Sequence, residues 1–315
     1  MASLGSFWAM RTRQLGSRGP EMSGIGYGAW EAGGEAWGPN ESEAAVVEAI
    51  HAGLDAGIDW IDTAEVYGNG VSERLVGKAI QGRRDDIVVA TKVAPQPEGS
   101  GFRSDQVRKA CEGSLERLGI DHIDLYQLHW ADEGRTPLEE TWGAMAALQD
   151  EGKVRSIGVS NFDREQIEQC LAIRHVDSLQ PEFSMLNREN AELIRWCGEQ
   201  GVGVVGYGPL AFGLLTGAIT AATRFQPGDW RGQKQAEGPF ADLARSLKVV
   251  DRLRPVAERL GCSLPQLGLA WNVHQPGVTA AIAGSRNPAH VRTNAAAGDI
   301  ELDEATIAEL DEILA

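Results

Sequence analysis

The segment Ile123–Ser160, IDLYQLHWADEGRTPLEETWGAMAALQDEGKVRSIGVS, indicates the fold. It opens with a short apolar run of β type, Ile123–His129. A helical pattern follows over Leu138–Glu151, with Pro137 just before its first residue. A second apolar run spans Ser156–Ser160. A strand, a helix and a strand at this spacing predict two parallel strands joined by a helical crossover.

The same alternation extends from this segment in both directions along the chain. The predicted strands are Ile25–Trp30, Ile58–Thr63, Ile87–Lys92, Ile123–His129, Ser156–Ser160, Ser178–Phe183, Val202–Tyr207 and Ala280–Ala283. The predicted helices are Glu43–Ala56, Glu73–Ile80, Asp105–Leu118, Leu138–Glu151, Arg164–Ala172, Arg188–Gln200, Leu264–Val273 and Asn287–Ala297. The residues expected to lead helices are Ser42, Ser72, Ser104, Asp163 and Ser263. Eight such units favour a closed (β/α)8 TIM barrel over an open sheet, and the nearly continuous apolar strands suit burial on both faces. We expect one domain over the 315 residues.

Three segments fall outside the eight units. Arg11–Ser23 is predicted to form a short hairpin that closes the floor of the barrel, and Asp242–Leu260 and Asp303–Leu314 are predicted as two extra helices. The irregular stretch Leu210–Ala241 follows the seventh strand, which places it at the mouth of a barrel. Its glycines and aromatic residues favour a lid that is mobile alone and folds over a bound cofactor.

The composition argues against several classes of protein. The net charge of −16 disfavours a nucleic-acid partner, because phosphates would be repelled. No run of 18 apolar residues is present to span a membrane, and the first residues are too polar for a signal peptide. The four cysteines include no CxxC pair and no zinc spacing. We therefore expect reduced thiols, no metal site and a cytoplasmic protein.

The segment Gly24–Ala29, GIGYGA, matches the GxGxxG/A pattern of dinucleotide-binding proteins. A Rossmann motif must open a helix after its glycines. Here the chain continues as Trp30-Glu-Ala-Gly-Gly, which does not favour a helix. The segment is therefore expected to be the first strand of the barrel and not a phosphate-binding turn.

Ionisable residues gather where three consecutive predicted strands end. Asp62 lies at the end of the second strand, Lys92 ends the third and His129 ends the fourth, while Tyr67 stands five residues beyond Asp62. In a barrel, polar residues at the carboxyl-terminal ends of strands are the candidates for catalysis. Each residue alone has an ordinary explanation, such as a helix cap or a solvated charge, but the coincidence of all four predicts an active site.

These four residue types suit hydride transfer to a carbonyl group. The reaction needs a proton for the developing alkoxide, and tyrosine, with an ordinary pKa of about 10, is a poor acid or base near neutral pH. A nearby ammonium stabilises tyrosinate and lowers that pKa. We expect Tyr67 to be the general acid or base and Lys92 to tune it. Asp62 would anchor Lys92, and His129 would orient the carbonyl oxygen.

These segments resemble those of the aldo-keto reductases. The resemblance is carried by Asp62-Thr-Ala-Glu-Val-Tyr67-Gly, by Lys92, by Leu-His129-Trp and by Gly158-Val-Ser-Asn-Phe162, and it covers nearly the whole chain. It implies the same four catalytic residues and a nicotinamide cofactor bound without a Rossmann domain. The segments similar to a bacterial branch that includes inositol-utilisation and sugar-type reductases are Met185–Arg188, Gly213–Gly217 and Pro227–Arg231.

The resemblance also implies a cofactor site along the mouth. By position, the residues that would line it are Gly28, Ala29, Trp30, Ser160, Asn161, Gln180, Tyr207, Gly208, Pro209, Leu210, Gly284, Ser285, Arg286, His290 and Asn294. Ser160, Asn161 and Gln180 would hydrogen-bond the nicotinamide carboxamide, and Tyr207 would stack on its ring. Arg286 would pair with a 2′-phosphate, so NADP(H) is the expected cofactor. His290 departs from the Arg or Gln more common at its position, and a mostly neutral histidine weakens the phosphate site.

The sequence leaves the substrate open. An aromatic mouth of Trp30, Trp130, Phe212 and Trp230 would suit a sugar ring, an aryl aldehyde or a flat polyketide, although the same rings could serve packing alone. We expect an NADP(H)-dependent oxidoreductase that reduces an aldehyde or ketone, or oxidises the corresponding alcohol or sugar. The direction of the reaction and the oligomeric state stay open.

Two other functions fit the sequence less well. A nucleotide-sensing subunit of a membrane channel would share the barrel, but the chain has no apolar segment that suggests a membrane partner. A metal-dependent barrel hydrolase would need a cluster of histidines and carboxylates at strand ends. His129 is the one histidine of six that stands at a predicted strand end.

Overall fold

Eight parallel strands form a closed barrel in the computed structural model, which describes residues 10–34, 36–38, 40–95, 101–132, 135–226, 228–232 and 237–315. Around the barrel the strands follow the order β10-β3-β4-β5-β6-β7-β8-β9. They are β3 (Ile25–Gly28), β4 (Trp60–Asp62), β5 (Val88–Val93), β6 (Ile123–Leu128), β7 (Val154–Ser160), β8 (Ser178–Gln180), β9 (Gly203–Gly206) and β10 (Ala280–Ala283). The predicted TIM barrel is confirmed.

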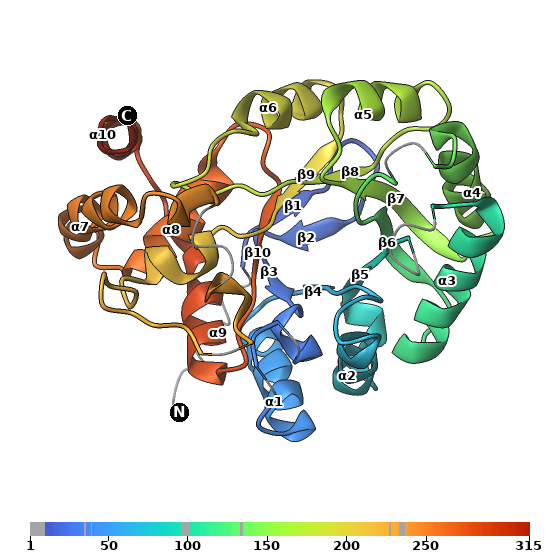
Figure 1. Cartoon of the computed structure of the whole chain (residues 1–315), viewed down its shortest axis with the longest axis horizontal. Helices are drawn as coiled ribbons and strands as arrows, with labels where there is room; N and C mark the ends of the chain where they lie inside the picture. The colour runs from blue at the N-terminus through green and yellow to red at the C-terminus, as the bar shows by residue number, and fades with distance from the viewer. Residues whose placement is uncertain are drawn as a thin grey trace, which may run out of the picture.

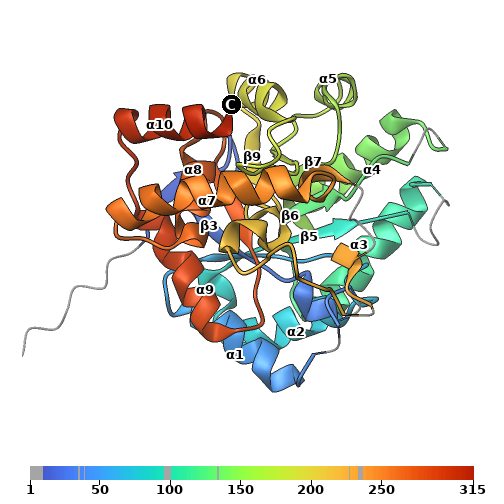
Figure 2. The same ribbon diagram turned by 60° about the vertical axis from the view of Figure 1, so that its left-hand side comes forward.

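Helices surround these strands, and α1 to α6 follow one another around the barrel in chain order (Figure 1). The helices that alternate with strands are α1 (Glu43–Leu54), α2 (Val71–Ile80), α3 (Ser104–Leu118), α4 (Leu138–Asp150), α5 (Arg164–Leu171), α6 (Ala191–Glu199), α8 (Leu264–His274) and α9 (Pro288–Ala295). The two predicted extra helices are α7 (Leu243–Arg259) and α10 (Glu304–Leu314), which pack against each other (Figure 2). Among the described residues, no helix has the length and apolar character needed to cross a bilayer.

The predicted hairpin is present and closes the floor of the barrel. Its strands are β1 (Thr12–Gln14) and β2 (Glu21–Ser23). Leu15 and Met22 are fully buried and belong to one apolar cluster with Trp60 and other side chains of the barrel interior. The indole nitrogen of Trp60 donates to the Ser23 carbonyl at 2.9 Å. Because Trp60 begins β4, this contact fixes the hairpin at the amino-terminal end of the strands.

Gly26, in the middle of residues 24–29, serves this interior packing. A Cβ on Gly26 would lie 2.1 Å from Cε2 of Trp60, so only glycine leaves room for the buried indole ring. The segment forms β3 and is followed by a short 3-10 turn, η1 (Glu31–Gly33), in place of a long helix. The expectation of a barrel strand is confirmed, and the resemblance to a Rossmann turn has a packing explanation.

Several element boundaries differ from the predictions. The strand predicted to reach Phe183 ends at Gln180, because Pro181 has no N–H to continue the ladder. The strand predicted to reach Trp30 ends at Gly28, where η1 follows. The helix predicted from Arg188 begins at Ala191, after a turn in which Ser184 and Asn187 exchange backbone hydrogen bonds.

Two of the predicted helix caps are wrong. Ser72 lies inside α2, where its hydroxyl donates to the carbonyl of Ala29 at 2.7 Å. Ser104 is the first residue of α3, and Arg103 precedes it as the N-cap. Ser42 and Asp163 cap their helices as predicted, since each side chain accepts a backbone N–H of the first turn.

In its described residues, the long segment after β9 contains the short 3-10 helices η3 (Ala211–Thr216), η4 (Trp230–Gly232) and η5 (Gly238–Phe240). Pro227 and residues 233–236 of the predicted lid lie outside the described residues. At η4 the backbone N–H of Trp230 donates to the carbonyl of Ala36 at 3.0 Å. The segment therefore reaches the loop between β3 and α1 and bridges two sides of the mouth.

Candidate active site

A buried ion pair lies in the mouth of the barrel. Lys92 Nζ on β5 is 2.6 Å from Oδ1 of Asp62, the last residue of β4, and the two side chains are 0% and 4% exposed. The same ammonium donates to the carbonyl of Thr63 at 2.9 Å and to Tyr67 Oη at 3.3 Å. Since β4 and β5 are neighbours in the barrel, their pairing sets this arrangement. The expected contacts of Lys92 with Asp62 and with Tyr67 are therefore present.

His129 completes the group of four. Its ring centroid is 5.6 Å from that of Tyr67, and the two rings are nearly perpendicular, at 78°. Its backbone N–H donates to the carbonyl of Val93 at 2.9 Å, which extends the pairing of β5 and β6 by one residue. The imidazole and the phenol both border the mouth cavity, whereas Lys92 lies behind them.

Burial controls the protonation of the two rings. Burial raises the pKa of Tyr67 above its ordinary value, and Asp62 adds to this, while the ammonium of Lys92 opposes both. The sequence predicted a net lowering, but desolvation outweighs the ammonium. Burial, with Lys92 beside it, holds the pKa of His129 well below its usual range. Burial disfavours the ammonium of Lys92, but Asp62 and Tyr67 outweigh that effect and raise its pKa. At neutral pH the tyrosine is a phenol and the histidine a neutral imidazole.

Amide and hydroxyl groups of the mouth lie beside the ion pair, and Gln180 connects them to it. Gln180 Nε2 donates to Asp62 Oδ2 at 2.9 Å, and the hydroxyl of Ser160 donates to the carbonyl of Gln180 at 2.8 Å. Asn161 Nδ2 donates to the carbonyl of His129 at 3.1 Å, and Asn161 Oδ1 accepts from the hydroxyl of Tyr207 at 3.0 Å. The residues predicted to hold the nicotinamide amide are therefore together, and they already hold one another.

A second buried network stands behind the segment that carries Tyr67. Glu73, fully buried on α2, accepts from the hydroxyl of Thr91 at 2.6 Å and pairs with Nε of Arg117 at 2.5 Å. Glu65 Oε1 accepts the backbone N–H of Ala94 at 3.0 Å. Burial raises the pKa of Glu65 to about 6, although Ala94 and Arg117 favour its carboxylate. These contacts tie the Tyr67 segment to β5 and α3.

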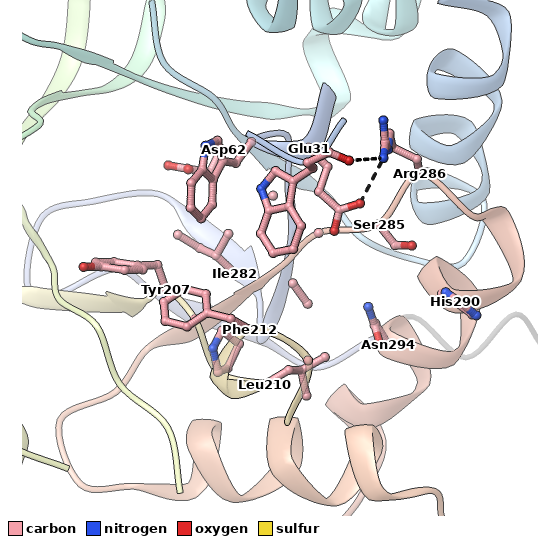
Figure 3. Close-up of a pocket in the computed structure, with 18 of the residues that line it drawn as sticks. Glu31, Asp62, Tyr207, Leu210, Phe212, Ile282, Ser285, Arg286, His290 and Asn294 are labelled. Carbon is pink, nitrogen blue, oxygen red and sulfur yellow. Dashed lines mark hydrogen bonds and ion pairs between the residues drawn. The ribbon is translucent and has the colours of Figure 1, made fainter. Parts of the chain in front are cut away.

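The mouth opens into an elongated cavity of about 940 Å³. Figure 3 shows Asp62 and Tyr207 on one side of it and Arg286, His290 and Asn294 on the other. The predicted residues that line the cavity are Gly28, Trp30, Asp62, Tyr67, His129, Trp130, Ser160, Asn161, Gln180, Tyr207, Gly208, Pro209, Leu210, Phe212, Gly284, Ser285, Arg286, His290 and Asn294. One cavity thus joins the predicted proton-transfer group to the predicted phosphate-binding group.

Besides Lys92, two predicted residues do not border this cavity, Ala29 and Trp230. The side chain of Ala29 is fully buried, and its backbone N–H donates to the carbonyl of Asp62 at 2.8 Å. Trp230 packs behind the cavity wall, with its ring centroid 5.1 Å from that of Trp30 and 4.7 Å from that of Phe212. Trp230 therefore supports aromatic residues that border the cavity.

The wall near Phe212 is built from strained backbone. Ala211 and Phe212 have φ of 47° and 54°, a left-handed conformation that costs roughly 1–2 kcal/mol for a residue other than glycine. A Cβ on Gly208, itself at a φ of 64°, would lie 3.1 Å from the ring of Phe212. Such strain concentrates at ligand-binding sites, where the surrounding structure holds it in place.

The sequence did not predict three charged or aromatic residues that line the cavity, namely Glu31, Trp37 and Arg231. All three lie on loops. Glu31 immediately follows Trp30, so extending each predicted strand end by one residue would have found it. Trp37 and Arg231 come together from distant segments, with the guanidinium 4.7 Å from the indole centroid. No local sequence pattern predicts that contact.

A closed parallel barrel with an ionisable cluster at its carboxyl-terminal mouth defines the class of TIM-barrel enzymes. Within that class, the model of the Aldo/keto reductase family matches residues 24–315, and the chain belongs to this family of oxidoreductases.

Two bacterial reductases are similar to this chain over most of their length. The chain is 38% identical to the aldo-keto reductase YhdN of Bacillus subtilis over 288 residues, which cover 89% of this chain and 86% of that protein. It is 35% identical to the NADH-specific methylglyoxal reductase of Escherichia coli, over 94% of this chain and 96% of that protein. A solved aldo/keto reductase from Klebsiella pneumoniae in complex with NADP and acetate matches with a TM-score of 0.74 and 34% identity, over 96% of each chain.

Proposed function

We propose that this protein reduces small aldehydes or ketones with NADP(H), or oxidises the corresponding alcohols or sugars, and that Tyr67 is the general acid and base. One observation carries the proposal. Tyr67 Oη lies 3.3 Å from a fully buried ammonium, that of Lys92, which Asp62 holds at 2.6 Å. A phenol beside a fixed, buried cation is an acid that can give up its proton and have the resulting charge stabilised.

The cavity fits a nicotinamide cofactor by its shape and by its polar groups. Its volume of about 940 Å³ is at the upper end of the range for small-molecule sites. A Cβ on Gly284 would lie 2.5 Å from the carbonyl of Gly28, so glycine at this position lets the backbones that follow β3 and β10 approach each other closely. Asn161 and Gln180 would hold the carboxamide, Tyr207 would support the ring, and Ser285, Arg286 and His290 would meet the adenosine phosphate. When bound, this cofactor supplies or accepts hydride at its nicotinamide ring.

The chain's own groups carry the proton. In reduction the carbonyl carbon receives hydride, and Tyr67 Oη gives its proton to the carbonyl oxygen, so that an alcohol forms. The phenolate left on Tyr67 is stabilised by Lys92 until a proton returns from solvent. His129, as a neutral imidazole, carries one N–H with which to orient the carbonyl oxygen. Oxidation of an alcohol runs through the same groups in reverse.

Two further aspects of this proposal concern the substrate and the compartment. The name of the Escherichia coli relative makes methylglyoxal a first substrate to try. Trp30, Trp130 and Phe212 supply aromatic walls for larger carbonyl compounds. The four cysteines are free, and three of them are buried, which supports a reducing compartment such as the cytoplasm.

The proposal is tested by following cofactor absorbance at 340 nm with methylglyoxal and with a panel of aldehydes, ketones and sugars. Both NADPH and NADH, and their oxidised forms, are needed. We expect reduction of at least one aldehyde. If both cofactors bind but no compound in either direction changes the absorbance, the proposed reaction is wrong. If neither cofactor binds, the proposed site is wrong as well.

A further inference from the structure

An acidic side chain lies at the end of the cavity where a phosphate is expected. Glu31, in η1, lines the cavity together with Ser285, Arg286 and His290. Its Oε2 is 3.8 Å from Nε of Arg286, and the two side chains are 26% and 27% exposed. Figure 3 shows Glu31 and Arg286 facing each other beside Ser285. A carboxylate here is unexpected for a site that should attract an anion.

Arg286 has other partners besides this carboxylate. Its Nη2 donates to the carbonyl of Trp37 at 2.9 Å, and its Nη1 donates to the carbonyl of Gly38 at 2.9 Å and to Asn40 Oδ1 at 3.2 Å. The guanidinium therefore holds the loop between β3 and α1 with its outer nitrogens and faces Glu31 with Nε. An incoming phosphate meets a guanidinium that these groups and Glu31 already engage.

Glu31 also lies within reach of other groups that would serve an anion. Burial raises the pKa of Glu31, whereas Arg286, Arg231 and His290, which come from different loops and a helix, favour its carboxylate. These are the donors and cations that a phosphate would use. In this structure Arg286 pairs with Glu31, whose carboxylate acts as an internal anion at the phosphate end of the cavity.

We propose that Glu31 sets cofactor preference, by competing with the 2′-phosphate of NADPH for Arg286 and by repelling that phosphate. This inference rests on the proposed cofactor site. NADH, which has a hydroxyl in place of the 2′-phosphate, meets no such repulsion, and a carboxylate can accept a hydrogen bond from a ribose hydroxyl. Arg286 and Ser285 alone would make the enzyme prefer NADPH. Glu31 reduces the difference in affinity between NADPH and NADH, so that the enzyme uses both cofactors.

The test compares binding of four ligands to the wild type and to Glu31→Gln. Dissociation constants for NADPH, NADH, 2′,5′-ADP and 5′-AMP are measured by titration calorimetry, which does not depend on turnover. Removing the charge while keeping a polar side chain should tighten NADPH and 2′,5′-ADP about tenfold. NADH and 5′-AMP should bind equally well or more weakly. Glu48→Gln, which removes one exposed carboxylate on α1, controls for the change in net charge.

The outcomes separate the inference from the proposed function. Equal changes in affinity for the ligands with a 2′-phosphate and for those without it would overturn the role of Glu31, and so would an equally large change in Glu48→Gln. A wild type that binds neither cofactor would instead overturn the proposed function. Arg286→Ala adds a second check. It should weaken binding of NADPH ten- to a hundredfold and binding of NADH much less. In that background Glu31→Gln should tighten NADPH by clearly less than tenfold, because Glu31 and the 2′-phosphate no longer compete for Arg286.

Discussion

Gln180 Nε2 donates a hydrogen bond to Asp62 Oδ2 at 2.9 Å, from strand β8 to strand β4 on the opposite side of the barrel. Lys92 holds the other oxygen of the same carboxylate. Gln180 was expected to serve the cofactor and Asp62 the proton-transfer group, and the hydrogen bond joins the two. Both oxygens of Asp62 are therefore fixed, and so is the ammonium that faces Tyr67.

Replacement of Tyr67 by Phe should abolish turnover, with a loss of at least about a hundredfold, because the phenol oxygen is the proposed proton donor. Binding of NADPH should change little, since the hydroxyl does not contact the groups proposed to hold the cofactor. Steady-state rates and fluorescence titration with NADPH measure the two effects. Retention of more than about a tenth of the wild-type rate across the pH range would rule out Tyr67 as the acid.

Replacement of Lys92 by Met should shift the pH dependence as well as lower the rate. Burial raises the pKa of Tyr67 and Lys92 opposes the rise, so the pKa should climb further without the ammonium. Alcohol oxidation needs the phenolate and increases as pH passes through this pKa. Its rising limb should therefore move to higher pH in the variant. A slower enzyme with an unchanged oxidation profile would leave Lys92 a positioning residue without influence on the proton.

Replacement of Gly26 by Ala should destabilise the fold by about 1–3 kcal/mol, because the added methyl group would overlap the fully buried ring of Trp60. Gly24→Ala is the matched control, since nothing lies within 4 Å of a Cβ there. Urea denaturation of both variants and the wild type measures the difference. Similar midpoints for the two variants would show that the barrel interior yields to the extra methyl group.

The segment after β9 should become more protected from hydrogen exchange when NADPH binds. It is tied to the loop between β3 and α1 through Trp230 and Ala36, and the strained turn at Phe212 lines the cavity. A ligand between these loops would restrain both. Exchange is measured on peptides from residues 212–231 with and without NADPH, with peptides from the floor hairpin as the unaffected reference. Identical exchange in the two states would make the segment a fixed wall and not a lid.

The sequence predicted the residues whose positions depend on regular structure. Asp62, Lys92 and His129 were found because apolar strands stop at them, and the closure of the barrel brings strand ends together. Glu31 and Arg231 were missed because they belong to loops, whose approach to the cavity is set by packing between distant segments. Ser72 was wrongly predicted to cap a helix. Its hydroxyl instead donates to the carbonyl of Ala29, which lies in a different part of the chain. The net direction of the pKa of Tyr67 was also missed, since it depends on the degree of burial.

Because the hairpin closes the floor of the barrel, mutations at the floor and mutations at the mouth should affect different properties of the enzyme. Leu15 and Met22 seal the end of the barrel remote from Tyr67 and share the interior with Trp60. A change that loosens this seal lowers the fraction of folded chains, but each folded chain keeps its mouth intact and its rate per molecule. In a cell such a change would reduce the amount of enzyme and leave its choice of substrate and cofactor untouched. Changes at the mouth would do the opposite, so abundance and selectivity can vary separately within one barrel.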